Sequence, residues 1–419
     1  MKTMYILLTC VFLLPFFSCT ETPLEPAPAV VDRTVTNATV SLFSYAGNGH
    51  TRGDVPAPPT YYKTGAEVTL LSNPGNMITT AGEWLYAWNT RQDGSGQDYL
   101  PDSTFTMPAS NVTMYAKWRS WAMGGDYSYT IGIYKYHVFT NAGTNTLTIT
   151  GSGVLDVLIV AGGGGGGCTM GGGGGGGGVI YQAAYTGIAA GTSVTVIVGA
   201  GGAGAPAGGT EGQPTANPMT KPAKNGGNSS FGSFIAIGGG AGGTGTDLTL
   251  QLGSAGGSGG GASGYGTPTG TGGGAGTAGQ GNRGGNGGGS YYSGGGGGAG
   301  AQGTDATATP HGGAGILNAI LGYDLYWAGG GGGAAYSVSP GGNGGIGGGG
   351  GGAVGVTTGG AGYNNGQPGG GGAAVTQCNT PGGDAGANTG GGGGGGSHYN
   401  ANNKGGDGGS GIVIIRYVY

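Results

Sequence analysis

Long runs of glycine constrain the fold of this chain more than any other feature of its sequence. Uninterrupted runs of five to eight glycines occupy residues 162–167, 171–178, 329–333 and 390–396, and the 116 glycines among 419 residues are concentrated after residue 150. In an α-helix each glycine costs about 1 kcal/mol relative to alanine. The extended three-residue turn of polyproline II has no steric cost for glycine. Because glycine keeps the N–H that proline lacks, extended runs can hydrogen-bond to one another.

Stretches with the pattern of β-strands frame and interrupt the glycine runs. Alternating apolar residues from Tyr134 to Val138, the apolar stretch 157–160 and the closing stretch 412–419 predict strands that could pair with one another. The motifs "LIVAGGGGGG", "FIAIGGGAGG" and "LYWAGGGGGG" each place an apolar and a small residue before glycines, which predicts stacked equivalent segments. Disorder is the opposing expectation, because ordering each backbone residue costs about 1–2 kcal/mol. The interspersed Val, Ile, Tyr and Phe favour order.

The stretch "SVTVIVGAGGAG" (193–204) contains a G-x-G-x-x-G pattern but does not predict a dinucleotide site. Such glycines bind a pyrophosphate only where they open a helix, with an acidic residue about 20 positions on. Here four prolines between residues 206 and 222 forbid a regular helix, and the position expected to be acidic is Lys224. The pattern is one strand that leads into one glycine run.

No cluster of catalytic or metal-binding residues stands out in the sequence. The four histidines are scattered and the acidic residues are sparse, so no triad, carboxylate pair or metal site can be nominated. Cys168 and Cys378 lack the paired spacing of a zinc site, and a disulfide between them stays open because nothing in the sequence fixes their distance. We expect no enzyme activity and no cofactor. Since only 7% of residues are charged and the net charge is -4, we expect no nucleic-acid partner.

The N-terminus has the pattern of an export signal. In "MKTMYILLTCVFLLPFFSC" one basic residue precedes an apolar run from Met4 to Phe17. Ser18 directly before Cys19 resembles the lipobox of bacterial lipoproteins, which implies that Cys19 is acylated and becomes the mature N-terminus. The two phenylalanines before Ser18 depart from the strict lipobox, and ordinary secretion is the alternative. The Pro-rich stretch that follows has the composition of an extended tether.

The first folded unit has ordinary glycine content and short strand-like runs. "ATVSLFSYAGNG", "AEVTLLSNPGN" and "NVTMYAKW" are bounded by Gly, Asn and Pro turn residues. The order "YYKTGAEVTLLSNPGN" then "WNTRQDGSGQDYLPDSTFTMPASNVTMYAKW" resembles one copy of the Listeria-Bacteroides repeat, the internalin B-repeat type. The resemblance implies a small β-grasp-like module of exported bacterial surface proteins. Trp84, Tyr86, Trp88 and Trp118 are expected to form its core, with a carbohydrate-stacking platform as the alternative.

The remainder resembles the bacterial and phage glycine-rich domain. The anchoring motifs are "VLIVAGGGGGG", "NGGNSSFG" (225–232) and "GSGIVIIRY" (409–417). The resemblance implies polyglycine segments packed against a β-sandwich. We therefore expect a mainly β protein with five parts: a lipoprotein signal peptide (1–18), a Pro-rich tether (19–37), a β-grasp-like repeat (38–118), a linker (119–130) and a β-sandwich-framed glycine-rich domain with polyproline II-like rods (131–419).

Tyrosine, serine and asparagine concentrate in the connectors between glycine runs. This is the composition of recognition loops, because tyrosine offers contact area at little entropic cost. The connectors "GSYYSG", "AGYNNGQP" and "GSHYNANN" predict four ligand-binding residues: Tyr291, Tyr292, Tyr363 and Tyr399. For Tyr326 and Trp327, in the connector "GYDLYW", ligand binding and a structural role, in which they cap a glycine run or begin a strand, are equally expected.

The sequence thus predicts a non-enzymatic surface protein. We expect lipid on Cys19 to anchor it to the outer membrane, facing outward, where it binds a surface glycan or protein in adhesion. A structural envelope spacer without a specific ligand is the alternative, and an ice-binding protein is a more distant one.

Overall fold

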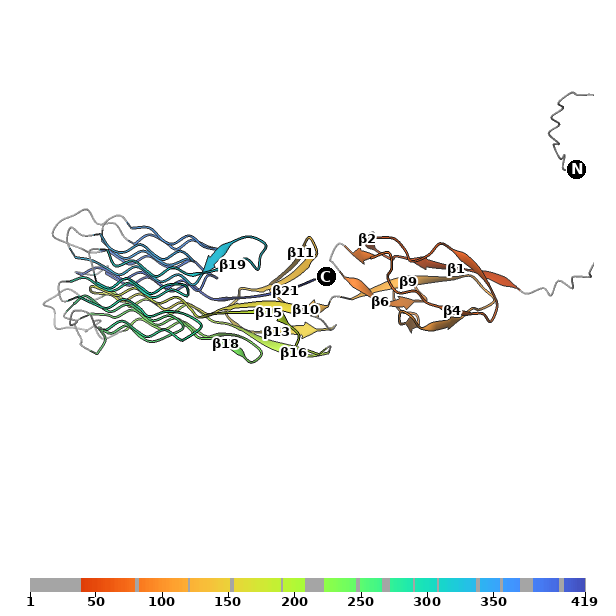
Figure 1. The fold of residues 1–419 in the computed structure, drawn as a ribbon, viewed down its shortest axis with the longest axis horizontal. Helices are drawn as coiled ribbons and strands as arrows, with labels where there is room; N and C mark the ends of the chain where they lie inside the picture. The colour runs from red at the N-terminus through yellow and green to blue at the C-terminus, as the bar shows by residue number, and fades with distance from the viewer. Residues whose placement is uncertain are drawn as a thin grey trace, which may run out of the picture.

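A computed structural model describes most of the chain beyond its N-terminal 38 residues. The described ranges are 39–79, 83–119, 121–150, 154–189, 191–207, 222–245, 249–265, 272–288, 291–306, 309–336, 340–354, 357–369, 380–398 and 403–418. Figure 1 shows a small β-module beside a larger part in which sheets continue into a bundle of extended segments. The described residues form strands, turns and extended segments without a helix, so the predicted mainly β class is confirmed. Within them there is accordingly no helix that could span a bilayer.

The small module is built on one mixed five-stranded sheet of order β3-β1-β9-β6-β7. Its first strand, β1 (Val40–Ala46), pairs in parallel with β9 (Val112–Arg119). The other strands are β2 (His50–Arg52), β3 (Thr60–Lys63), β4 (Glu67–Thr69), β5 (Ile78–Thr79), β6 (Trp84–Asn89), β7 (Asp98–Tyr99) and β8 (Thr104–Thr106). The parallel pairing of first and last strands suits the predicted β-grasp-like module, and the repeat family stays a prediction.

Two tryptophans of this module, Trp88 and Trp118, serve its core. Trp88 is fully buried, and its indole Nε1 donates to the carbonyl of Leu71 at 2.8 Å. The Trp118 Nε1 donates to the carbonyl of Asn48 at 2.8 Å, and its ring packs against the same core cluster. With their donors satisfied inside the module, these two rings favour the core interpretation over a stacking platform.

Two five-stranded sheets pack face to face in the larger part. One has the order β10-β13-β16-β17-β18 and the other β11-β12-β21-β14-β15. Their strands are β10 (Ala122–Met123), β11 (Tyr127–Ile131), β12 (Tyr134–Phe139), β13 (Gly143–Ile149), β14 (Leu155–Val160), β15 (Val179–Tyr185), β16 (Ser193–Val198), β17 (Ser229–Phe231), β18 (Phe234–Ala236) and β21 (Ile412–Val418). The closing strand β21 lies antiparallel between β12 and β14, which confirms the predicted pairing. Both β10 and β11 begin within the stretch expected as a linker.

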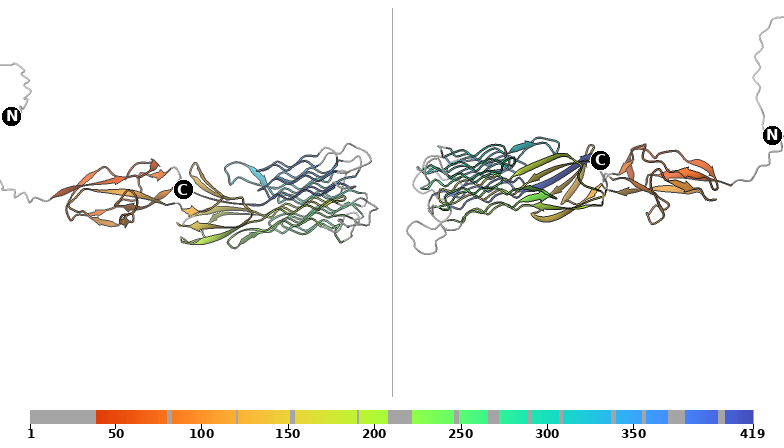
Figure 2. Two further views of the ribbon diagram at one scale, coloured as in Figure 1. Left: turned by 180° about the vertical axis from the view of Figure 1, so that it is seen from behind. Right: turned by 60° about the horizontal axis from the view of Figure 1, so that its bottom comes forward.

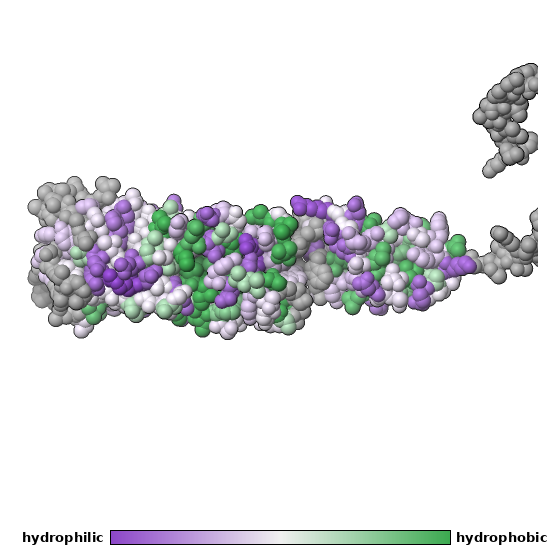
Figure 3. Space-filling model, viewed as in Figure 1, coloured by the Kyte–Doolittle hydropathy of each residue, from purple (hydrophilic) through white to green (hydrophobic). Residues whose placement is uncertain are grey.

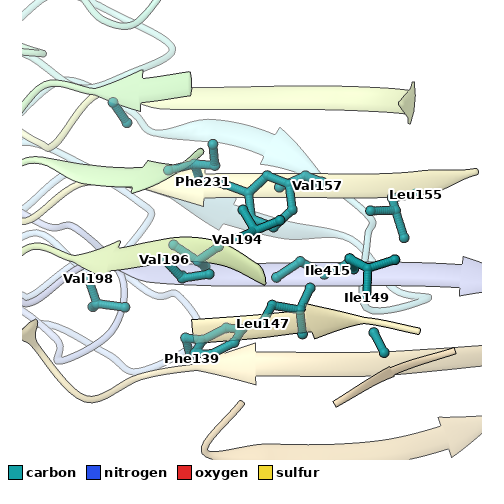
Figure 4. Close-up of a cluster of buried hydrophobic side chains, with 14 of the residues drawn as sticks. Phe139, Leu147, Ile149, Leu155, Val157, Val194, Val196, Val198, Phe231 and Ile415 are labelled. Atoms are coloured by element: carbon teal, nitrogen blue, oxygen red, sulfur yellow. The ribbon is translucent and has the colours of Figure 1, made fainter. Parts of the chain in front are cut away.

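The central strands of the second sheet, β12, β21 and β14, are buried on both faces. On one face, side chains such as Leu147, Val196 and Phe231 meet Val157 and Ile415 across the two sheets (Figure 4). The opposite face packs against the hairpin of β19 (Ile316–Asn318) and β20 (Leu325–Trp327), with Trp327 completely buried. Burial on both faces explains the near-continuous apolar stretches of β14 and β21, which do not alternate.

Beyond the sheets, the glycine runs form one hydrogen-bonded bundle. The three predicted motifs of apolar residues followed by glycines are strands that continue into glycine segments: β14, β18 and β20 each lead into one. The run Gly171–Gly178 is entirely buried, and its eight N–H groups donate to neighbouring carbonyls at 2.7–3.1 Å. Its N–H groups bond in turn to segments 390–396, 237–243 and 294–297, and its carbonyls accept from 161–167, 258–261 and 331–334. Six neighbours therefore surround it, and Figure 2 shows such segments lying side by side.

The bonds return to the same neighbour every third residue, as the N–H groups of Gly171, Gly174 and Gly177 do toward segment 390–396. Polyproline II has this period of three residues per turn. The backbone dihedral class itself stays a prediction. The period also explains why Ala200 and Ala203 are exposed while Gly202 between them is buried: outward positions tolerate a side chain. A Cβ on Gly202 would lie 2.0 Å from the carbonyl oxygen of Lys224.

Candidate functional site

Four rings meet at the end of the bundle remote from the sheets. Each lies at the end of a different glycine segment, and together they form the distal aromatic cluster: Tyr265, Tyr291, Tyr336 and His398. The His398 ring lies 5.5 Å from Tyr265 in a stacked arrangement, 5.4 Å from Tyr336 and 5.7 Å from Tyr291. The rings of Tyr291 and Tyr336 lie 5.2 Å apart. His398 is thus the hub that the three tyrosines surround.

Backbone anchors fix the segment ends that carry these rings. The segment that leaves β14 turns back at residues 168–170, and the carbonyl of Met170 accepts from two hydroxyls, Ser263 Oγ at 2.9 Å and Ser293 Oγ at 2.7 Å. These serines stand two residues from Tyr265 and Tyr291 along the chain. Tyr291 has a φ of 66°, a left-handed conformation that a bulky residue rarely adopts. Residues kept in such strained backbone conformations are found mostly at functional sites.

The distal aromatic cluster combines a buried hub with exposed faces. His398 is 7% exposed, whereas Tyr291 and Tyr336 are 44% and 39% exposed. No member carries a carboxylate, ammonium or guanidinium group. Nor do the described residues contain a group of three His, Cys, Asp or Glu side chains that could hold a metal ion. The cluster therefore suits contact through ring faces and hydroxyl groups rather than recognition of charge.

The structure separates the four tyrosines predicted as binding residues. Tyr291 belongs to the distal aromatic cluster. Tyr292 is half-buried and its carbonyl accepts from the N–H of Gly288 at 3.1 Å, so its backbone pairs with that of Gly288. Tyr363 lies elsewhere, stacked on Trp327 at 5.7 Å. Tyr399 and the proposed lipid attachment residue Cys19 lie outside the described residues.

Of the four cluster members, sequence reasoning nominated only Tyr291; it missed Tyr265, Tyr336 and His398, although His398 lies in the connector "GSHYNANN". Tyr265 and Tyr336 end the stretches "GASGY" and "GGGAAY", so each directly follows a glycine segment. That position was the available signal, because a side chain at the end of a segment must lie at an end of the bundle. Cys168 is fully buried in the turn beneath the cluster, and Cys378 lies outside the described residues, so the disulfide between them stays open.

Comparison with protein families agrees with this architecture. The model of the family described as "Glycine-rich domain" matches residues 140–418, which is more than half of the chain. The chain belongs to the glycine-rich domain family. The matched residues of this glycine-rich domain include both sheets from β13 onward and the entire bundle.

Two relatives of the glycine-rich domain protein come from Evansella cellulosilytica. One, provisionally named a Gly-rich membrane protein, is 37% identical over 80 residues, which are 18% of this chain and 9% of the relative. The other, provisionally named a membrane protein, is 32% identical over 76 residues, which are 18% of this chain and 11% of that relative. The chain thus spans only 9% and 11% of the length of these curated relatives. No solved structure matches it.

Proposed function

We propose that this protein is a non-enzymatic cell-surface lipoprotein whose glycine-rich domain binds a glycan or a protein in adhesion. The observation that carries the proposal is the distal aromatic cluster, in which four segments distant in sequence present rings on one bonded scaffold. Its exposed tyrosines come from backbone held by hydrogen bonds, so little conformational entropy remains to be lost on binding. A binding surface at the end of the bundle remote from the small module also suits a chain anchored through residues that precede that module.

The membrane link rests on two independent observations. The relatives bear membrane-protein names, and residues 1–18, directly before Cys19, have the sequence pattern of an export signal. Cys19→Ser should abolish incorporation of a labelled fatty acid and release the protein from the membrane fraction. Undiminished labelling of this variant would refute attachment at Cys19. Protease treatment of intact cells then reports whether the anchored protein faces outward.

Binding is tested with the full chain, without its signal peptide, on arrays of bacterial and host glycans and on immobilised surface proteins. Tyr291→Ala and Tyr336→Ala should each weaken binding about tenfold or more, the loss typical of a central aromatic contact. Tyr61→Ala, at a 69% exposed tyrosine of the small module, is the matched control and should leave binding unchanged. Equal binding by all three variants would contradict a distal site. If no array or surface binds, the structural spacer becomes the better account.

A further inference from the structure

A second aromatic site lies at the opposite end of the bundle, beside the sheets. The tyrosine pocket has a volume of about 230 Å³ and is lined by Tyr127 and Tyr129 of β11, Val138 of β12, Leu321 of the β19–β20 turn, and Tyr363. β11 is the outermost strand of its sheet, and Tyr127 is 59% exposed. Hydrophobic side chains gather on the surface over this middle region of the molecule (Figure 3).

Two walls of the tyrosine pocket are held rigid from behind. The ring of Tyr129 stacks on Tyr136 at 5.1 Å with an interplanar angle of 18°. The ring of Tyr363 stacks on Trp327 at 5.7 Å with an angle of 22°. Tyr136 and Trp327 are 1% and 0% exposed, so each wall ring rests on a ring fixed in the core. Preformed ring faces of this kind bind a ligand without first losing side-chain freedom.

The polar groups of the pocket are hydroxyls rather than charges. Burial, with the neighbouring hydroxyls of Tyr363, Tyr136 and Tyr323, raises the pKa of Tyr129 to about 12. Its hydroxyl therefore remains a neutral hydrogen-bond donor and acceptor at physiological pH. Behind Tyr363, the buried indole Nε1 of Trp327 has no hydrogen-bond partner among the described residues. In native proteins a buried N–H donor of this kind normally has a hydrogen-bond partner.

The volume of the tyrosine pocket and the chemistry of its lining residues together limit the class of ligand that it can bind. Drug-sized ligand sites begin at about 300 Å³, so this pocket suits a single small ring. An anion would find no cation among the lining residues, and a cation would find no carboxylate. A wholly apolar ring would form no hydrogen bond with the tyrosine hydroxyls at the pocket. A sugar ring offers C–H groups to the negative faces of the aromatic rings and hydroxyls to the pocket's edge.

We propose that the tyrosine pocket binds one pyranose ring of a neutral glycan, with Tyr129 and Tyr363 as stacking walls and Tyr127 at the entrance. This site is separate from the distal aromatic cluster and does not depend on it. The protein would then carry two binding positions on one scaffold, one at each end of the bundle.

Saturation-transfer NMR on the full chain tests the proposal with methyl pyranosides of glucose, galactose, mannose and N-acetylglucosamine as probes. At least one should receive saturation, strongest at its ring C–H protons. Tyr129→Ala and Tyr363→Ala should lower this signal about tenfold, as loss of a central aromatic contact does. Tyr129→Phe, which keeps the ring, should weaken binding only about two- to tenfold through its lost hydroxyl. Tyr291→Ala in the distal cluster should leave the signal unchanged.

Three results would overturn the pyranose assignment. One is the absence of transfer to every probe in a chain whose thermal unfolding is normal. Another is a signal that survives both alanine substitutions. The third is preferential binding of the peptide TPLEPAPAVV, the Pro-rich stretch at residues 22–31, because aromatic grooves also accept polyproline II peptides. If Tyr291→Ala loses binding to the glycan or protein arrays but keeps the pyranoside signal, only the distal aromatic cluster is affected. The two sites can therefore be distinguished.

Discussion

Replacing Gly174 with alanine places a methyl group in the middle of the bundle. The Cβ would lie 2.1 Å from the carbonyl oxygen of Gly164, where real Cβ contacts essentially never fall below 3.0 Å. That carbonyl accepts from the N–H of Gly393 at 3.0 Å, and Gly174 itself donates to the carbonyl of Gly393 and accepts from Gly331 at 2.8 Å each. The clash is with backbone on a segment that six neighbours enclose, so no side chain can rotate away to relieve it.

The magnitude follows from three effects. Overpacking a filled interior costs about 1–3 kcal/mol. If the carbonyl of Gly164 turns away, one buried peptide group loses its partner, which adds about 1–3 kcal/mol. Alanine also restricts the unfolded chain and returns about 0.4–1 kcal/mol. The net destabilisation is about 2–5 kcal/mol, which lowers Tm by about 3–9 °C for a domain of this size.

Differential scanning calorimetry of the full chain measures this shift. The matched control is Ala203→Ser, because Ala203 is exposed at an outward position of a segment in the same bundle. The control should shift Tm by less than about 2 °C, as surface substitutions do. If the Gly174→Ala protein has the same Tm as the Ala203→Ser control, the enclosed bundle is refuted, because a loosely packed glycine chain has room for a methyl group at every position.

Two further predictions concern the sheets that frame the bundle. Asp156→Asn should destabilise the domain by about 1.5–3 kcal/mol in urea unfolding, because its carboxylate accepts from Arg416 Nε at 3.1 Å in a mostly buried pair; an unchanged midpoint would contradict it. Burial, with the charge of Lys135, lowers the pKa of His137 below 6.5 despite its bond to the Gly124 carbonyl. The unfolded chain therefore takes up the proton first, and stability should fall as pH drops below about 6.5, a slope that His137→Gln should reduce.

Several strands of this chain could be predicted from its sequence. The closing strand, the apolar stretch of β14 and the motif of strand followed by glycine were predicted and are present, because apolar patterning reports burial directly. The G-x-G-x-x-G stretch forms the end of β16 and the extended segment after it, and no helix begins at its glycines among the described residues. Its alanines occupy the outward positions of a three-residue period. Runs of pure glycine cannot reveal this period in the sequence, because every position in them holds the same residue.

The grouping of site residues could not be predicted in the same way. Neighbouring segments recognise each other through backbone N–H and carbonyl groups, which are identical for every glycine, so the sequence holds little information on which segments lie together. Tyr265 and His398 are far apart along the chain and stack only because their segments end at the same place. For the same reason Tyr291 and Tyr363, predicted as one set of binding loops, lie in different sites.

Amide hydrogen exchange through the glycine runs tests the central claim most directly, because both proposed sites depend on an ordered scaffold. The account predicts strongly slowed exchange at residues 162–167, 171–178, 329–333 and 390–396, with Gly171–Gly178 among the slowest, since that run is buried and bonded at every N–H. Exchange of these amides at the rate of a free chain would contradict the bundle, and with it both sites.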